Sequence, residues 1–205
     1  VTNDDWGEAA NAAEISLVSK ALGAFALPSD SLDAAVLVDV TPGAYTVHVT
    51  GAPDTAGIVL IELYDGGQVA AGEARLINLS TRGNTDEGDA VMIPGFVLAG
   101  AGARTLLIRA VGPSLSAFGV TDFLPDPVLS LFQGETRIKT VNTWSDAADP
   151  ATIEAISTAV GAFTLEPGSA DAVMLVVLMP GEYTAHAEGA GIATGNVLVE
   201  VYAVP

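Results

Sequence analysis

The sequence predicts an all-β protein, a β-sandwich or jelly roll in two lobes, with one short helix in each of two repeated segments. Short apolar segments recur along the chain between turns rich in Gly, Asn, Asp and Pro. These segments are joined by turns and not by helices, which argues against a parallel βαβ sheet. A long stretch of the chain also occurs twice, which predicts two lobes of similar architecture.

The repeat has a constant offset of 138 residues, so that residues 1–65 align without a gap with residues 139–203. In this alignment 29 of the 65 pairs are identical, including Trp6 with Trp144, Tyr45 with Tyr183 and His48 with His186. Residues 66–140 have no second copy. The chain therefore divides into an acidic half-repeat (1–65) and a complete repeat (66–205), which consists of a strand-rich middle segment (66–140) and a second acidic segment (141–205).

Each acidic segment is expected to form a helix followed by three strands. In the half-repeat, apolar residues at helical spacing predict a helix over 8–22 that ends at Gly23. In the second copy the helix begins at Ser145 or at Asp149-Pro150, an N-cap and N1 pair, and ends at Gly161. The strands that follow are expected at 34–40, 45–49 and 58–64, and in the second copy at 172–178, 183–187 and 197–203.

Alternation within these strands predicts which side chains form a core. Tyr45 is expected to face inward, with Thr46 and His48 outward. We expect four residues to anchor the cores of the two copies, namely Trp6, Trp144, Tyr45 and Tyr183. The middle segment is expected to add strands at 74–80, 90–98, 105–111 and 128–132.

Composition excludes several classes of protein. A mean hydropathy of +0.46 is too apolar for a disordered acidic tail. The net charge of −18 repels phosphate, so no nucleic-acid partner is expected. No cysteine is present, and no apolar run reaches the roughly 18 residues of a membrane span. The low Lys content and the Thr/Gly/Ala-rich composition are typical of a secreted bacterial protein, which predicts an extracellular or cell-surface location.

Charge is unevenly distributed among the three segments. The half-repeat carries ten acidic residues and one basic residue, and residues 141–205 carry eight acidic residues and no basic one. The middle segment, with seven acidic and six basic residues, is the natural electrostatic partner of an acidic segment. We therefore expect its arginines to make ion pairs or assembly contacts, the candidates being Arg75, Arg82, Arg104 and Arg109. Arg109, which alternates with apolar neighbours, is expected to pair internally with a carboxylate of an acidic segment; an anion ligand is the alternative.

Several runs together resemble a repeat module of large secreted or surface proteins of environmental bacteria, mostly hypothetical proteins. The runs are ARLINLSTRG (74–83), LLIRAVGPSL (106–115), DPVLSLF (126–132), PGEYTAHAEGAG (180–191) and VLVEVYAV (197–204). The resemblance covers 66–205 and, for its second half, 1–65, and it implies a β-sandwich building block. The PGxYT pattern is also similar to the C-terminal sandwich domains of secreted peptidases. This chain departs from the module pattern because it begins half a period early.

Few residues suggest a catalytic or metal site. The histidines, His48 and His186, lie at equivalent outward positions, and the run 112–116 lacks the final Gly of a nucleophile elbow. The best Ca²⁺ candidate is the loop that contains Asp86, Glu87 and Asp89, which lacks EF-hand spacing and is otherwise a solvated acidic loop. Trp6 and Trp144 are the alternative candidates for stacking on a glycan.

Three functions follow from these observations. The favoured one is a non-enzymatic structural subunit of an extracellular filament or surface assembly, which self-associates head-to-tail through the unmatched half-repeat, because contacts between unlike surfaces propagate. The alternative is a glycan- or Ca²⁺-binding adhesion module of a larger secreted protein. An enzyme is supported only by the number of carboxylates, since no acid–base pair or cofactor loop is present. Whether the half-repeat belongs to a longer tandem array or is completed by another chain stays open.

Overall fold

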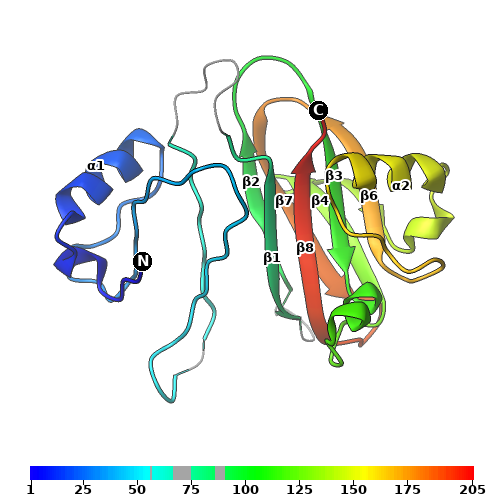
Figure 1. Cartoon of the computed structure of the whole chain (residues 1–205), viewed down its shortest axis with the longest axis horizontal. Helices are drawn as coiled ribbons and strands as arrows, with labels where there is room; N and C mark the ends of the chain where they lie inside the picture. Colours follow the sequence, from blue (N-terminus) through cyan, green and yellow to red (C-terminus); the bar gives the residue numbers. More distant parts are fainter. Residues whose placement is uncertain (56, 67–74, 86–90) are drawn as a thin grey trace. The chain divides into compact units, whose positions relative to one another are not determined.

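The structure is a computed structural model that describes residues 1–55, 57–66, 75–85 and 91–205. The chain forms two compact units, Val1–Leu76 and Ile77–Pro205. The first contains the half-repeat and the second contains a β-sandwich (Figure 1).

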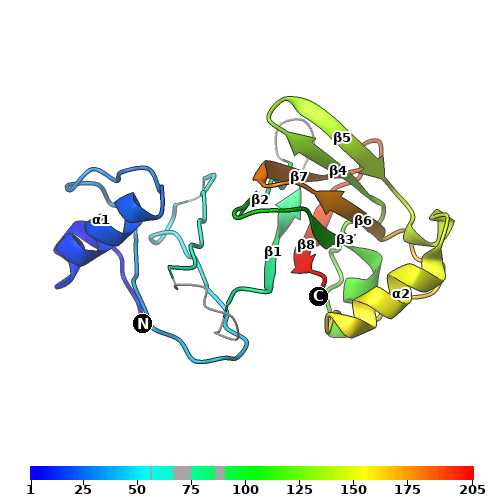
Figure 2. The same ribbon diagram turned by 90° about the horizontal axis from the view of Figure 1, so that it is seen from above.

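The sandwich consists of two four-stranded antiparallel sheets, as predicted for the fold class (Figures 1 and 2). The first sheet has the strand order β1-β8-β3-β6, and the second has the order β2-β7-β4-β5. The strands are β1 Asn78–Thr85, β2 Gly95–Leu98, β3 Arg104–Val111, β4 Pro127–Gln133, β5 Thr136–Val141, β6 Ala172–Leu178, β7 Gly181–Gly189 and β8 Gly195–Ala203.

The two sheets interleave strands from the two halves of the complete repeat. Strands β1 to β5 lie in 78–141, whereas β6, β7 and β8 lie in the second acidic segment. In the ladders of these sheets, β6 pairs with β3, β7 pairs with β2 and β4, and β8 pairs with β1 and β3. Each strand of the acidic segment therefore takes its ladder partners from 78–141, and no ladder joins two of these three strands.

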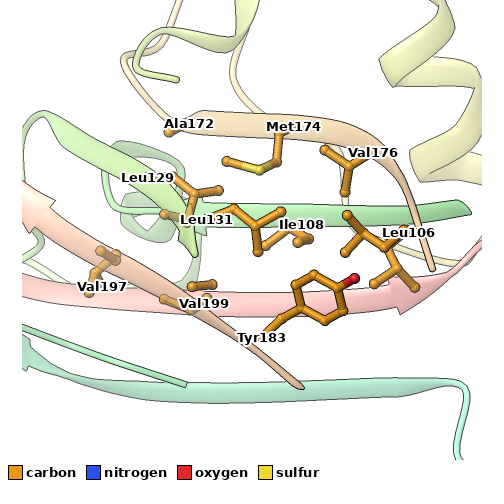
Figure 3. Close-up of a cluster of buried hydrophobic side chains, with 14 of the residues drawn as sticks. Leu106, Ile108, Leu129, Leu131, Ala172, Met174, Val176, Tyr183, Val197 and Val199 are labelled. Carbon is orange, nitrogen blue, oxygen red and sulfur yellow. The ribbon is translucent and has the colours of Figure 1, made fainter. Parts of the chain in front are cut away.

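The core between the sheets is built by strand alternation. On β3, Leu106 and Ile108 point into a buried cluster that includes Leu129 of the opposite sheet (Figure 3). Ala110, which has the same alternation on β3, belongs to this cluster as well. Ala185 and Ala187 on β7 are fully buried in the same cluster. Burial of each large aliphatic side chain stabilises a fold by about 1.5–3 kcal/mol, so this interior is the main source of stability of the sandwich.

The outer face of the first sheet is also buried. Leu107 and Val111, which alternate with the core residues of β3, join a second apolar cluster that includes Trp144 and Ile153. This cluster packs the sheet against η2 (Pro113–Phe118), η3 (Trp144–Asp146) and α2 (Pro150–Ala159). Because β3 is buried on both faces, its run of apolar residues is nearly continuous.

The half-repeat forms its helix but not its strands. It contains η1 (Trp6–Glu8) and α1 (Ala12–Ala21), and α1 ends with Gly23 at φ 81°. The predicted strands at 34–40, 45–49 and 58–64 are absent from the described part of the half-repeat, which covers 1–55 and 57–65. The prediction was wrong because the equivalent strands β6, β7 and β8 depend on partners from 78–141, and a second copy of that segment is not present in the sequence.

The strand predictions for the sandwich are close to the observed elements. The segment 172–178 matches β6, and 183–187 and 197–203 lie within β7 and β8. Sequence reasoning missed β5. The strands expected at 74–80 and 90–98 begin later, at Asn78 for β1 and at Gly95 for β2; residues 74 and 90 lie outside the described residues. Among the helices that the structure describes, none is long and apolar enough to cross a membrane.

Candidate functional site

A buried arginine on β3 is the most conspicuous polar feature of the sandwich. Arg109 is fully buried, and its Nη2 lies 2.8 Å from Oε2 of Glu200, directly opposite on β8. Nη2 and Oε2 make a charge–charge contact, but their geometry is not that of a hydrogen bond. The aligned hydrogen bond is donated by Nη1 to the carbonyl oxygen of Phe163, at 2.7 Å. The guanidinium carbon also lies 4.4 Å from the centre of the Phe163 ring, which adds a cation–π contact.

Tyr202 completes the arginine cluster, defined here as Arg109, Phe163, Glu200 and Tyr202. Its hydroxyl donates a hydrogen bond of 2.7 Å to Oε1 of Glu200. Burial and this hydrogen bond raise the pKa of Tyr202, so the phenol stays protonated and can donate. Glu200 is thus held by a cation on one oxygen and a phenol on the other, which compensates the cost of burying its charge.

A second buried carboxylate, that of Asp171, lies directly before the first residue of β6. Asp171, which is fully buried, accepts hydrogen bonds on Oδ1 from the backbone N–H groups of Gly112 (2.8 Å) and Ser114 (3.3 Å). Its Oδ2 accepts from the hydroxyl groups of Ser114 and Ser169. With four donors, the charged carboxylate is stabilised without a cation. Residues Gly112, Ser114, Ser169 and Asp171 are called the aspartate cluster below.

The run 109–114 on the middle segment supplies the partners of both buried carboxylates. Arg109 meets Glu200, and three residues later the turn that contains Gly112 and Ser114 meets Asp171. Gly112 is required there, because a Cβ at this position would lie 1.9 Å from the carbonyl oxygen of Leu124. Both carboxylates belong to the second acidic segment, so the two clusters fix that segment to the middle segment.

The half-repeat carries the acidic-segment members of both clusters. At the offset of 138 residues, Phe25, Glu62 and Tyr64 correspond to Phe163, Glu200 and Tyr202. The Tyr64 hydroxyl already donates to Oε1 of Glu62, at 3.1 Å, as Tyr202 does to Glu200. Partial desolvation and Glu62 raise the pKa of Tyr64 as well. The half-repeat therefore has three of the four residues of an arginine cluster, and the missing member is the arginine.

The aspartate cluster is incomplete in the same way. Asp33 and Ser31 correspond to Asp171 and Ser169. Asp33 is exposed, and the Ser31 hydroxyl, which is buried, has no hydrogen-bond partner among the described residues. In the sandwich the donors to the aspartate come largely from Gly112 and Ser114 of the middle segment.

The apolar residues of the half-repeat are exposed where their equivalents in the sandwich are buried. Relative exposures of the side-chain pairs show the contrast: Val36 (49%) and Met174 (1%), Tyr45 (61%) and Tyr183 (4%), Val59 (60%) and Val197 (0%). The half-repeat thus has a set of exposed apolar residues, called the unpaired strand residues, which consists of Val36, Val38, Val40, Tyr45, Val47, Val49, Val59, Ile61 and Leu63. Exposed apolar surface of this extent is typical of interaction sites.

Of the expected core anchors, Trp6, Trp144 and Tyr183 are buried. The expectation for Tyr45 was wrong, because its side chain needs the opposing sheet that the half-repeat lacks. The buried tryptophans do not present a ring face for a sugar. Trp6 Nε1 instead donates to the carbonyl oxygen of Pro28, and Trp144 Nε1 donates to the Ser169 hydroxyl.

The other candidate residues are not brought together. Arg75, Arg82 and Arg104 are exposed, and their assembly role stays a prediction. The Ca²⁺ candidates Asp86, Glu87 and Asp89 lie outside the described residues. In the part of the chain that the structure describes, no group of three or more His, Cys, Asp or Glu side chains could hold a metal ion.

The histidines lie away from both clusters. His186 on β7 packs on the Phe132 ring with 4.4 Å between ring centres, and desolvation lowers its pKa. His48 is exposed in the half-repeat. The Ser114 hydroxyl donates to Asp171 and accepts from the N–H of Glu166, so it has a structural role and no histidine partner in these contacts.

Sequence reasoning anticipated a carboxylate partner for Arg109 but missed the aspartate cluster. The signal was in the repeat: Ser31, Asp33, Glu62 and Tyr64 are each identical in the second copy. Polar residues that are kept in both copies, next to apolar strand segments, indicate buried polar partners and not solvated positions.

No protein-family model matches the chain, and no curated protein matches it. Among solved structures, the chain is similar to the pre-peptidase C-terminal domain of a collagenase from Bacillus anthracis. The sequence identity is 12% and the TM-score is 0.37, with 61% of this chain and 89% of that chain covered.

Proposed function

We propose that this chain is a non-enzymatic structural subunit of an extracellular assembly, in which the half-repeat joins it to a neighbouring polypeptide by β-strand complementation. The observation that carries the proposal is the set of unpaired strand residues, which are exposed in the half-repeat, whereas the equivalent residues of the sandwich are buried or, for Val201 opposite Leu63 in the alignment, partly buried. Complementation would supply backbone hydrogen bonds and a core without disulfide bonds, which this cysteine-free chain does not have.

Charge supports the same proposal. The half-repeat has a net charge of −9, from ten acidic residues and one basic residue, and it folds in a unit of its own. A partner surface with exposed arginines would attract the half-repeat and increase the rate of encounter. The like charges of two half-repeats would disfavour contacts between them. Head-to-tail association of identical copies, which the sequence predicted, is one form of such an assembly.

The experiment compares native material with the isolated chain. Electron microscopy of the native assembly, with and without chelator, would show whether regular fibres or layers exist. Hydrogen exchange would then measure protection at 34–40, 45–49 and 58–64. We expect slow exchange in the assembly and fast exchange in the isolated chain, because complementation buries these backbone groups. Fast exchange at these positions in the native assembly would contradict the proposed function.

A further inference from the structure

Backbone pairing limits what can complete the half-repeat. In the sandwich, β6, β7 and β8 each pair with strands of 78–141, and no ladder joins them to one another. The equivalent segments of the half-repeat therefore cannot build the same sheets among themselves. They need strands that stand in the places of β1, β2, β3 and β4, which together occupy 78–133.

Side-chain chemistry limits the partner further. The half-repeat has Phe25, Glu62 and Tyr64 at the equivalent sequence positions, and Tyr64 already donates to Glu62, but it lacks the arginine that completes the arginine cluster. Its Asp33 lacks the donors that Gly112 and Ser114 supply to Asp171 in the sandwich. One short run of a partner would meet both requirements: an arginine near the end of an apolar strand, followed by a glycine at the third position and a serine at the fifth.

We infer that the half-repeat binds a polypeptide segment that resembles residues 77–141, with an Arg-x-x-Gly-x-Ser run at the end of its central strand, and that the places of β6, β7 and β8 on this segment are vacant. The inference rests on the proposed function and names its partner. The arginine of that segment forms an ion pair with Glu62 beneath the ring of Phe25, and its Gly-x-Ser turn donates hydrogen bonds to Asp33. The unpaired strand residues become the inner face of a second sandwich.

Residues 77–141 of this sandwich are excluded as that segment, because their strands already pair with β6, β7 and β8. The same holds for these residues in a second copy that keeps its own sandwich. The partner is therefore a further segment of this type, on which the places of β6, β7 and β8 are vacant.

The test adds such a segment to the full chain. A copy of residues 66–138 is joined before Val1, which reproduces the junction between Ile138 and the residue that follows it in the repeat. Hydrogen exchange is measured at 34–40, 45–49 and 58–64 in the fused chain and in the original chain. We expect exchange at these positions to slow by about 100-fold or more on fusion, and the β signal in circular dichroism to increase.

Matched substitutions in the added copy test the recognition chemistry. R109M in the added copy removes the ion pair with Glu62 while it keeps an apolar stem, and R82M removes an arginine that is exposed in the sandwich. We expect R109M to lose most of the added protection and R82M to keep it. Glu62→Gln in the half-repeat should behave like R109M. Equal behaviour of R109M and R82M would overturn the inferred arginine contact.

A truncated chain provides a second, independent test in case the fused chain fails to fold for other reasons. Residues 1–141 contain one acidic segment and one middle segment, so the half-repeat should occupy the place that 142–205 vacates. In the sandwich Asn78 pairs with Tyr202, whose equivalent is Tyr64, and the connection from Tyr64 to Asn78 is long enough for a hairpin loop. Absence of protection in both the fusion and the truncated chain would overturn the inference.

The source of the partner is tested on the original chain alone. Sedimentation at increasing concentration, combined with hydrogen exchange, should show a monomer with fast exchange at 34–64. A homo-oligomer in which these residues become protected would overturn the inference, because a second copy would then be the partner, while the proposed function would stand. If the native assembly also exchanges quickly at these residues, the proposed function fails together with the inference.

Discussion

The half-repeat and the second acidic segment are two copies of one sequence in two different contexts. Their helical parts have the same structure: α1 spans Ala12–Ala21 and α2 spans Pro150–Ala159, and these bounds differ by the repeat offset. The Trp6 N–H donates to the Asp33 carbonyl oxygen at 2.9 Å, and the Trp144 N–H donates to the Asp171 carbonyl oxygen at 2.8 Å. Beyond these aspartates the copies diverge, because one continues as β6 to β8 and the other forms no strand in its described part.

The difference shows which part of a repeat can fold from local interactions. A helix satisfies its backbone groups within its own segment, so α1 forms without a partner. A strand satisfies them with neighbouring strands, and here all of the neighbours lie in 78–141. Strand propensity alone does not compensate for a missing partner. The two copies therefore serve as an internal control, and each comparison below sets a substitution in the sandwich against one in the half-repeat.

The largest expected difference concerns the buried ion pair. Arg109→Ala leaves the carboxylate of Glu200 buried without its cation, which should decrease the free energy of unfolding of the sandwich by about 3–5 kcal/mol. Glu62→Ala, in the exposed equivalent of Glu200, should change it by less than about 0.5 kcal/mol. Urea denaturation followed by circular dichroism measures both changes.

Two controls sharpen this comparison. Arg82→Ala removes an exposed arginine and should have little effect on unfolding. The double variant R109M/E200M replaces both charges with side chains of similar length and should recover most of the stability that R109A loses. If R109A and R82A unfold at the same urea concentration, the ion pair does not stabilise the sandwich.

The next difference concerns the aspartate cluster. Asp171→Ala leaves the buried N–H groups of Gly112 and Ser114 without an acceptor, and should destabilise the sandwich by about 2–3 kcal/mol. Asp33→Ala, in the exposed equivalent, should be nearly neutral. Thermal unfolding of the two variants measures the difference. A comparable loss in D33A would mean that Asp33 already has donors in the half-repeat.

Much of the sandwich could be predicted from its sequence. The predicted strand over 172–178 agrees with β6, because a continuous apolar run between turn signals is typical of a strand buried on both sides. The helix start at Asp149-Pro150 could be predicted because an N-cap followed by Pro at N1 is a local signal. Strand β5 could not, since its residues TRIKTV lie on an exposed edge, where no burial pattern distinguishes a strand from a loop.

The half-repeat and the polar clusters show what sequence patterns leave undetermined. Residues 34–40 have the pattern of a buried strand, but the pattern does not state which strands will be beside it. Tyr45 was expected in a core for the same reason and is exposed. The aspartate cluster joins residues 112, 114, 169 and 171, and no spacing rule connects a turn after β3 with a residue before β6. These features depend on the tertiary arrangement and on the availability of partners.

A smaller difference is expected at a pair of equivalent glycines. A Cβ at Gly195, where β8 begins, would lie 2.6 Å from the backbone carbon of Phe123, and φ is 149°. Gly195→Ala should therefore destabilise the sandwich by about 1–3 kcal/mol. A Cβ at the equivalent Gly57 meets nothing within 4 Å, so Gly57→Ala should be neutral. Chemical denaturation of both variants tests this contrast, and equal losses would contradict the close approach at Gly195.

The smallest expected difference concerns the N-cap residue that precedes each helix. The Asp149 side chain caps α2 by accepting a hydrogen bond from the Thr152 N–H, whereas Asn11 makes no side-chain cap at α1. Asp149→Ala should lower the Tm of the sandwich by about 2–4 °C, and Asn11→Ala should have no measurable effect.

The pH dependence of this cap gives an independent measurement. Its hydrogen bonds with the side chain and the N–H of Thr152 lower the pKa of Asp149 below the ordinary value of 3.8. Because the folded-state pKa is the lower one, the stabilisation is present above the unfolded-state pKa and is lost as the pH falls through the folded-state pKa. The difference in Tm between the original chain and D149A should therefore have its maximum value at pH 7 and should decrease below about pH 4. A difference that is unchanged at low pH would show that the charge of Asp149 does not contribute to the cap.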